Sequence, residues 1–208
     1  MNKKFDVFLF DFDGTLFDTL ESSIYVFEEA YKNIGIKVNH DEVLSYTREP
    51  IPNSYVRLVG SMKGYKGFIA DIDRLVKSQK VTDMAVIYPD TARILKQLKE
   101  QKKIVGIVTS NSKKHVIDVL NRFDLVPYFD VIVGNEIAPI PKPNPEPILK
   151  ALELLNIKDK EKVVYIGDSI NDALAASNAE VHPLLLDRLN EFKHLDYDVV
   201  DSLDEIIG

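Results

Sequence analysis

Two aspartates near the N-terminus have the spacing of a catalytic carboxylate pair. Asp11 and Asp13 directly follow the apolar residues 7–10, an unbroken run that predicts a strand buried on both faces. Side chains alternate along a strand, so both carboxylates point the same way. Gly14 allows a sharp turn, with its backbone open to a ligand. Carboxylates this close repel each other, so a proton, a cation or both must neutralise the pair.

Polar side chains also follow the later apolar runs. Residues 104–108 and 163–166 predict two more buried strands, and residues 131–133 a short one that leads into a proline-rich loop. The carboxyl ends of parallel strands share one edge of a sheet, where α/β proteins bind ligands. Each polar residue alone could be a helix cap or a solvated loop residue. Together we expect them beside the first pair: Thr109, Lys142, Asp168 and Asp172.

This cluster would hold four carboxylates against a single lysine, and it cannot stay ionised without a counter-cation. Its groups offer only oxygen ligands, with no histidine or cysteine nearby, which favours Mg²⁺ over zinc. A hydroxyl, an ammonium and Mg²⁺ around two carboxylates form a site for phosphoryl transfer. In that reaction, positioning and charge stabilisation provide most of the catalysis.

Strands that alternate with amphipathic helices must position these residues. We expect an α/β fold, a Rossmann-like doubly wound parallel sheet with right-handed crossovers. Further strands are expected at 184–186 and 198–200. Helices are expected after Asp90, over 116–123, from about Glu146, around 173–176 and after Ser202.

Residues 18–85 show no strand pattern and are expected to form an inserted α-helical cap domain. The core domain would then comprise residues 1–17 and 86–208. Two helices carry capping-box spacing, the first at Asp18 and Glu21 and the second at Asn39 and Glu42. The first helix should run from about residue 19 to 34 and stop at Gly35, and the second should end before Pro50. A third is expected near Asn53, then a loop at Gly60, Gly64 and Gly67, and a last helix running towards Lys80.

The composition excludes several classes of protein. The 208 residues are 45% hydrophobic and 28% charged, as in soluble globular proteins. No apolar run approaches the ~20 residues that cross a membrane, and no secretory signal is recognisable, so we expect a cytoplasmic monomer or homodimer without membrane partners. The absence of cysteine excludes disulfides and thiolate sites. A net charge of −7 disfavours nucleic acid as a partner.

With these residues in this order, the sequence resembles the haloacid dehalogenase-like (HAD) superfamily. It is most similar to the branch with a helical C1 cap after the first strand, to which phosphoglycolate phosphatase belongs. Four motifs in order are far more specific than one DxD pair. They stand here as Asp11-Phe12-Asp13-Gly14-Thr15, Thr109, Lys142-Pro143-Asn144-Pro145 and Gly167-Asp168-Ser169-Ile170-Asn171-Asp172.

The resemblance implies a Mg²⁺-dependent phosphatase for a small phosphorylated metabolite. Asp11 would attack phosphorus and form an aspartyl-phosphate. Asp13 would protonate the leaving oxygen and then deprotonate the hydrolytic water. Thr109 would bind a phosphoryl oxygen, and Lys142 would offset charge on the phosphoryl group and on Asp11.

The resemblance also implies the remaining ligands. Backbone N–H groups around Gly14 and Ser110 would bind phosphate, with Asn111 beside them. Mg²⁺ would be held by Asp11, the backbone carbonyl of Asp13 and Asp168. Asp172 would be either a further ligand or a residue that supports one.

Other activities of this superfamily stay open at this point. Asp13 favours phosphate chemistry over dehalogenation, because a dehalogenase needs no acid for its leaving group. A β-phosphoglucomutase-like mutase usually has a histidine where this chain has Ser23, and an inorganic pyrophosphatase remains an alternative. A receiver-like phospho-acceptor domain would be shorter and would lack the helical insert.

The cap is expected to select the substrate. Arg48 replaces part of a Gly-x-Pro stretch that faces the site in related caps. It either binds a second anionic group of the substrate or is a solvated surface arginine.

Overall fold

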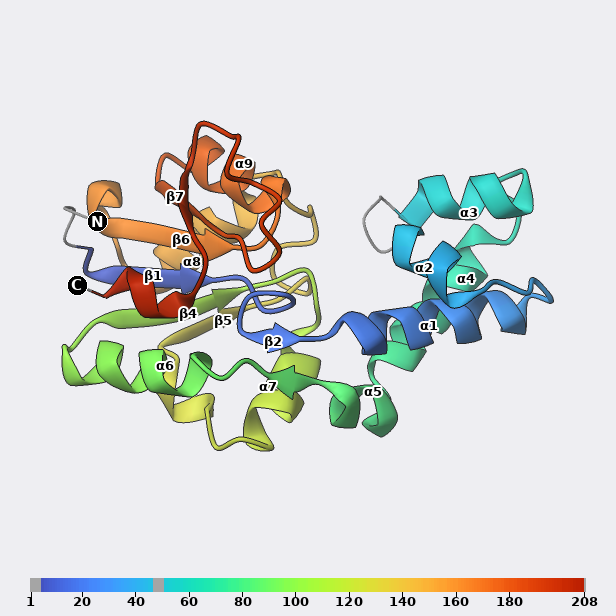
Figure 1. Cartoon of the computed structure of the whole chain (residues 1–208), viewed down its shortest axis with the longest axis horizontal. Coiled ribbons are helices and arrows are strands. Elements are labelled where there is room, and N and C mark those ends of the chain that lie inside the picture. Colours follow the sequence, from blue (N-terminus) through green and yellow to red (C-terminus); the bar gives the residue numbers. More distant parts are fainter. Residues whose placement is uncertain (1–4, 47–50, 208) are drawn as a thin grey trace. The chain divides into compact units, whose positions relative to one another are not determined.

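The computed structural model describes residues 5–46 and 51–207 and contains one six-stranded parallel sheet (Figure 1). The strand order is β5-β4-β1-β6-β7-β8, which is the arrangement of a Rossmann-like sheet and confirms the predicted fold class. In Figure 1 the blue β1 lies between the green β4 and the orange β6. The strands are β1 (Val7–Phe10), β4 (Ile104–Val108), β5 (Val131–Val133), β6 (Val163–Gly167), β7 (His182–Leu186) and β8 (Asp198–Val200).

Helices cover the sheet where the apolar periodicity predicted them. The face of β1 that carries Val7 and Leu9 packs against α8 and α9 in one core cluster. Ala175 and Ala176 of α9 are fully buried there, and their small side chains allow the helix to approach the sheet closely. The helices of this unit are α6 (Thr91–Glu100), α7 (Lys113–Asn121), α8 (Glu146–Leu154) and α9 (Ile170–Asn178), with short 3-10 helices at Val126–Tyr128, Lys160–Lys162 and Leu203–Ile206.

A small antiparallel ladder was not predicted. It joins β2 (Phe17–Asp18) to β3 (Val86–Ile87), and two residues are too few to show a strand period. It also overturns the predicted cap of the first helix. Asp18 belongs to β2, and Thr19 occupies the N-cap without a side-chain cap hydrogen bond.

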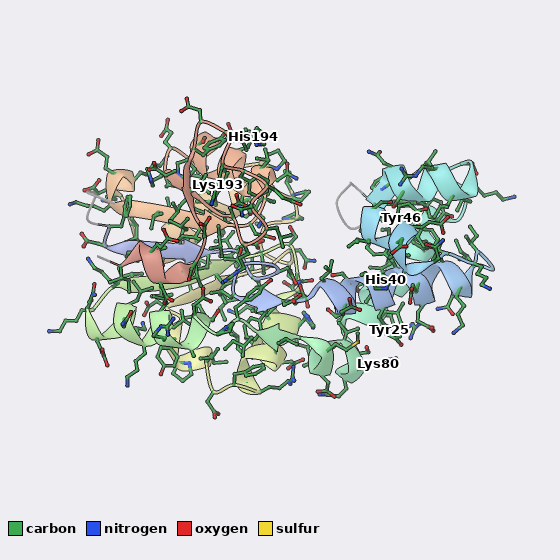
Figure 2. All side chains as sticks on the ribbon, in the orientation of Figure 1. Tyr25, His40, Tyr46, Lys80, Lys193 and His194 are labelled. Carbon is green, nitrogen blue, oxygen red and sulfur yellow. The ribbon has the colours of Figure 1, made fainter. Side chains whose placement is uncertain are left out.

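The chain divides into two compact units, Met1–Asp18 with Val86–Gly208 and Thr19–Ala85. The second unit is helical and has its own aromatic core, which includes Tyr31, Tyr55 and Phe68. At its surface the Lys80 ammonium lies 3.7 Å from the centroid of the Tyr25 ring (Figure 2). Its helices are α1 (Leu20–Asn33), α2 (His40–Tyr46), α3 (Ile51–Val59), α4 (Tyr65–Val76) and α5 (Gln79–Met84).

Two helix boundaries in this unit differ from those expected. The capping box at Asn39 and Glu42 forms as their spacing predicted: the Asn39 backbone N–H donates to the Glu42 carboxylate, and the Glu42 backbone N–H donates to the Asn39 side-chain oxygen. Gly67, however, lies inside α4, where packing of the apolar face offsets the cost of a helical glycine. Lys80 lies in the separate helix α5, because the Ser78 side chain accepts from the Val81 N–H and starts a new helix.

A buried ion pair joins the loop after Asp13 to the far end of the chain. Arg188 donates twice to the Asp90 carboxylate at 3.0 Å and once to the Thr15 carbonyl at 3.0 Å. The same carboxylate accepts from the Ser202 hydroxyl and the Leu203 N–H. Asp90 therefore stands at the start of α6, as predicted, but its carboxylate binds other segments of the chain instead of capping that helix.

The hydrogen bonds set the charge of this aspartate. Burial by itself raises the pKa of Asp90, but the bonds from Arg188 and from the Leu203 N–H outweigh it and hold that pKa below its ordinary value. The pair therefore contributes its full stabilisation above the unfolded-state pKa, and this contribution is lost as the pH falls through the lower folded-state value.

In the described part of the chain, no helix is long and apolar enough to cross a bilayer.

We predict that Arg188→Met lowers the free energy of unfolding, measured with urea at neutral pH, by about 3–5 kcal/mol, because it leaves a buried carboxylate unpaired. The deficit relative to wild type should shrink as the pH falls, because the unpaired Asp90 carboxylate of the variant takes up a proton more readily than the paired carboxylate of the wild type, whose pKa is held below its ordinary value.

Arg93→Met is the matched control. Its pair with Asp204 has side chains 56% and 46% exposed, against 17% and 6% for Arg188 and Asp90. The control should therefore cost less than about 1 kcal/mol. Equal losses from both substitutions would contradict this account of the buried pair.

Candidate active site

The Lys142 ammonium joins three of the four motifs. Its Nζ lies 2.8 Å from Asp11 Oδ1 and 2.5 Å from Asp172 Oδ1, and it donates to the Tyr165 hydroxyl at 3.0 Å. An ammonium has three N–H donors, and each has an acceptor here. Burial lowers the pKa of Lys142, but the two carboxylates outweigh burial and hold that pKa well above its ordinary value. The lysine is therefore charged.

Tyr165 was missed by sequence reasoning, because an aromatic residue inside a buried strand is typical of a core position. Its hydroxyl lies 3.0 Å from the Val108 carbonyl and 3.2 Å from Asp172 Oδ1. Since that hydroxyl accepts from Lys142, its own proton is free to donate to the Val108 carbonyl. Tyr165 thus links the strand before Thr109 to the lysine. Only its position, two residues before Gly167-Asp168, would have signalled this role.

Asp172 is held from both sides. Its Oδ2 accepts from the Ser169 N–H at 3.1 Å and from the Ser169 hydroxyl, which completes a capping box at the start of α9. Its Oδ1 accepts from Lys142. A Cβ on Gly167 would lie 2.3 Å from Asp172 Cγ, so only glycine fits there. With both oxygens bound to donors, Asp172 is suited to orient Lys142.

The site has the charge and the donor set for a divalent cation. One carboxylate oxygen from each of Asp11, Asp168 and Asp172 lies within 4.8 Å of the others. Burial raises the pKa of Asp11 well above its ordinary value, Lys142 lowers it, and the neighbouring aspartates raise it further. Burial and the charge of Asp172 raise the pKa of Asp168 to about 7. Ionised carboxylates in this position need a cation, and all-oxygen ligands fit Mg²⁺.

Gly14 allows the first and fourth motifs to meet. Its φ is +70°, and a Cβ at this position would lie 1.9 Å from Asp168 Oδ2. The Gly14 N–H donates to the Phe17 carbonyl at 2.8 Å. The contribution of Gly14 is the space it leaves for the Asp168 carboxylate.

Asp13 is bound to the loop of the second motif. The Asn111 side-chain amide donates to Asp13 Oδ2 at 2.6 Å, and the Asn111 backbone N–H donates to Thr109 Oγ1 at 3.1 Å. Thr109 is buried at the end of β4, next to β1 in the sheet. The structure thus brings Asp11, Asp13, Thr109, Lys142, Asp168 and Asp172 to one edge, as the strand ends predicted.

The end of β5 supports this loop, a role that sequence reasoning missed although Asn135 and Glu136 follow closely after the strand. Asn135 donates from its backbone to the Asn111 carbonyl at 3.0 Å and from its side chain to the Ser110 carbonyl at 3.1 Å. Glu136 accepts from the Lys113 N–H at 3.0 Å. A Cβ on Gly134 would lie 2.8 Å from the Asn111 carbonyl oxygen. The loop of Ser110 and Asn111 is therefore packed tightly against its neighbour.

Arg48 lies outside the described residues. Asn178 donates from its side chain to the Pro143 carbonyl at 3.1 Å and so ties the end of α9 to the loop of Lys142.

We predict that Gly14→Ala destabilises the fold more than Gly35→Ala does. Both glycines have positive φ, +70° and +78°, but a Cβ on Gly35 meets nothing within 4 Å. Gly35→Ala should therefore cost only the left-handed backbone penalty of about 1–2 kcal/mol, and Gly14→Ala should add the clash with Asp168. Urea unfolding of both variants measures the difference, and equal costs would contradict the close packing of Asp168 on Gly14.

Known proteins match most of this chain. The family model described as haloacid dehalogenase-like hydrolase matches residues 8–185. A protein assigned as pyrophosphatase PpaX in Caldanaerobacter subterraneus is 35% identical over 188 residues, covering 86% of this chain and 80% of its own. A phosphoglycolate phosphatase of Psychrobacter arcticus is 30% identical over 189 residues, covering 85% and 80%.

A solved structure agrees with the sequence matches. The crystal structure of a protein assigned as a haloacid dehalogenase-like hydrolase from Bacteroides fragilis has a TM-score of 0.86 and 27% identity, and the match covers 98% of this chain and 100% of that one. This confirms the resemblance drawn from the four motifs: the chain belongs to the haloacid dehalogenase-like hydrolases.

Proposed function

We propose that this protein is a Mg²⁺-dependent phosphatase that hydrolyses a small phosphorylated compound through an aspartyl-phosphate on Asp11. The observation that carries the proposal is the Lys142 ammonium bound to both Asp11 and Asp172, beside a third, half-buried carboxylate, Asp168. This arrangement keeps a nucleophile, a fixed positive charge and a cation-binding pair at one strand edge.

Asp11 would act as the nucleophile. Its backbone N–H donates to the Ile166 carbonyl at 2.8 Å, and Lys142 holds its Oδ1. Mg²⁺ bound by Asp11 and Asp168 would supply the positive charge that keeps Asp11 ionised and draws in the phosphoryl group. In the first step a carboxylate oxygen of Asp11 forms a bond to phosphorus while the bond from phosphorus to the leaving oxygen breaks.

Asp13 would move the proton in both steps. In the first step it gives its proton to the leaving oxygen. In the second step a water attacks the phosphorus of the aspartyl-phosphate, its proton passes to Asp13, and Asp11 is released with inorganic phosphate. The starting protonation states of both carboxylates are thereby restored.

Thr109 and Lys142 are suited to bind the phosphoryl oxygens. The Thr109 hydroxyl accepts a hydrogen bond from the Asn111 N–H, so its own O–H can donate a hydrogen bond to a phosphoryl oxygen of the substrate. Lys142 carries a fixed charge that offsets the charge of the transferring group. Neither residue needs to move a proton.

The relatives suggest two kinds of substrate, a phosphate monoester and pyrophosphate. One relative is named a phosphoglycolate phosphatase and another is assigned as a pyrophosphatase. The mutase alternative has less support, because Ser23 stands in α1 where the related mutases have a histidine.

We predict that the wild type releases phosphate from at least one of pyrophosphate, 2-phosphoglycolate and p-nitrophenyl phosphate. Asp11→Asn should reduce release to the rate of buffer alone, and Asp13→Asn should reduce it by roughly 10²–10⁴-fold. A phosphate-release assay measures all three proteins.

Asp6→Asn is the control, since Asp6 is exposed and precedes the opposite end of the same strand, where it pairs with Lys103. It should keep full activity. Full activity in Asp11→Asn would refute the covalent mechanism, and isomerisation without phosphate release would favour a mutase.

We also predict that Mg²⁺ raises the thermal unfolding midpoint, because a ligand that binds only the folded state stabilises it by about 2.7 kcal/mol at 100 times its dissociation constant. In EDTA, Asp168→Asn should be more stable than wild type, since it removes a like charge, and Mg²⁺ should no longer stabilise it. Asp73→Asn, an exposed carboxylate on α4, should respond to Mg²⁺ as the wild type does. An unchanged Mg²⁺ response in Asp168→Asn would exclude Asp168 as a ligand.

A further inference from the structure

We propose that Asn111 is a positioning residue that orients the acid Asp13, instead of a ligand for the phosphoryl group. This inference rests on the proposed function, because it assigns a partner to the proton carrier of that reaction. Its basis is the hydrogen bond from the Asn111 side-chain amide to Asp13 Oδ2, which is 2.6 Å long and joins the first motif to the loop that follows Thr109.

The backbone of Asn111 is fixed on both sides, so its amide has a defined direction. Its N–H donates to Thr109 Oγ1 at 3.1 Å, and its carbonyl accepts from the Asn135 N–H at 3.0 Å. Gly134 leaves no space for the loop to shift toward β5. A side chain anchored in this way loses little further conformational entropy when it holds another residue.

The hydrogen bond fixes the orientation of the Asp13 carboxyl group. It makes Oδ2 the oxygen that accepts from Asn111, and an oxygen that accepts an N–H in this way is not the one that donates a proton along the same bond. After the proton has been given to the leaving group, the same N–H stabilises the carboxylate, since a hydrogen bond to a charged acceptor is stronger than one to a neutral acceptor. Asn111 thus favours both the orientation of the acid and the product of its proton transfer.

Substrates whose leaving groups differ in basicity can distinguish a role in orienting Asp13 from a role in binding phosphate. An alkoxide is a strong base and needs a proton as it leaves, whereas p-nitrophenolate is a weak base and leaves without one. A residue that acts through Asp13 therefore matters for alkyl phosphates and much less for p-nitrophenyl phosphate. A residue that binds the phosphoryl group matters equally for both.

The test compares kcat/KM of Asn111→Ala on 2-phosphoglycolate and on p-nitrophenyl phosphate. This parameter reports the formation of the aspartyl-phosphate, whereas kcat also includes its hydrolysis, a step common to all substrates. We expect kcat/KM for 2-phosphoglycolate to fall roughly 10- to 100-fold, the range of one hydrogen bond to a charged group. For p-nitrophenyl phosphate the fall should be less than about 3-fold.

Two further measurements exclude a merely structural effect. In an Asp13→Ala background, adding Asn111→Ala should change kcat/KM by less than about 2-fold, because a residue that acts through Asp13 has nothing left to orient. The inhibition constant of inorganic phosphate should stay unchanged in Asn111→Ala. Asn33→Ala removes another Asn–Asp bond of 2.6 Å, on the surface of the cap, and should leave all parameters as in wild type.

Equal losses on both substrates, with weaker inhibition by phosphate, would overturn the proposal and make Asn111 a phosphate ligand. If Asn111→Ala unfolds, Asn111→Asp keeps the shape without the N–H donor and should show the same selective loss. A wild type that is inactive on every ester, or an active Asp11→Asn, would instead refute the proposed function itself.

Discussion

The burial of the Asp11 carboxylate beside an equally buried ammonium is the constraint on which the rest of the site depends. A charge removed from water is costly unless partners replace the solvent. Lys142 meets three acceptors, and two of them are themselves held by a second group. The Ser169 capping box holds Asp172, and the Val108 carbonyl anchors Tyr165. The sheet edge is therefore a network in which few members could move alone.

The members of this network that could be predicted from the sequence lie mostly at strand ends. The runs that became β1, β4 and β6 are apolar without interruption, so the polar residue that follows each run stands out. Parallel pairing then brings those residues together, because β1 pairs with both β4 and β6. Thus the sheet and the carboxylate cluster followed from two simple properties, the burial of strands and their common direction.

What could not be predicted depends on contacts between distant segments. Tyr165 has the pattern of a core residue, and only its hydroxyl gives it a second role. Asn135 lies in a loop without a motif, and its bonds to the loop of Asn111 require the fold to be known. Asp18 had the spacing of a cap, but pairing of its backbone with Val86 took precedence. In each case a tertiary contact decided between local possibilities of similar energy.

The central place of β1 has a consequence for synthesis on the ribosome. This strand is made first, yet Val7 pairs with Ile104 and Val163, which are translated much later. Until then its apolar side chains have no sheet to join, and such segments favour misassembly. The intervening unit, Thr19–Ala85, is continuous in sequence and rich in local helical contacts, which form quickly. The nascent chain therefore gains a folded insert before it can complete the domain that carries its chemistry.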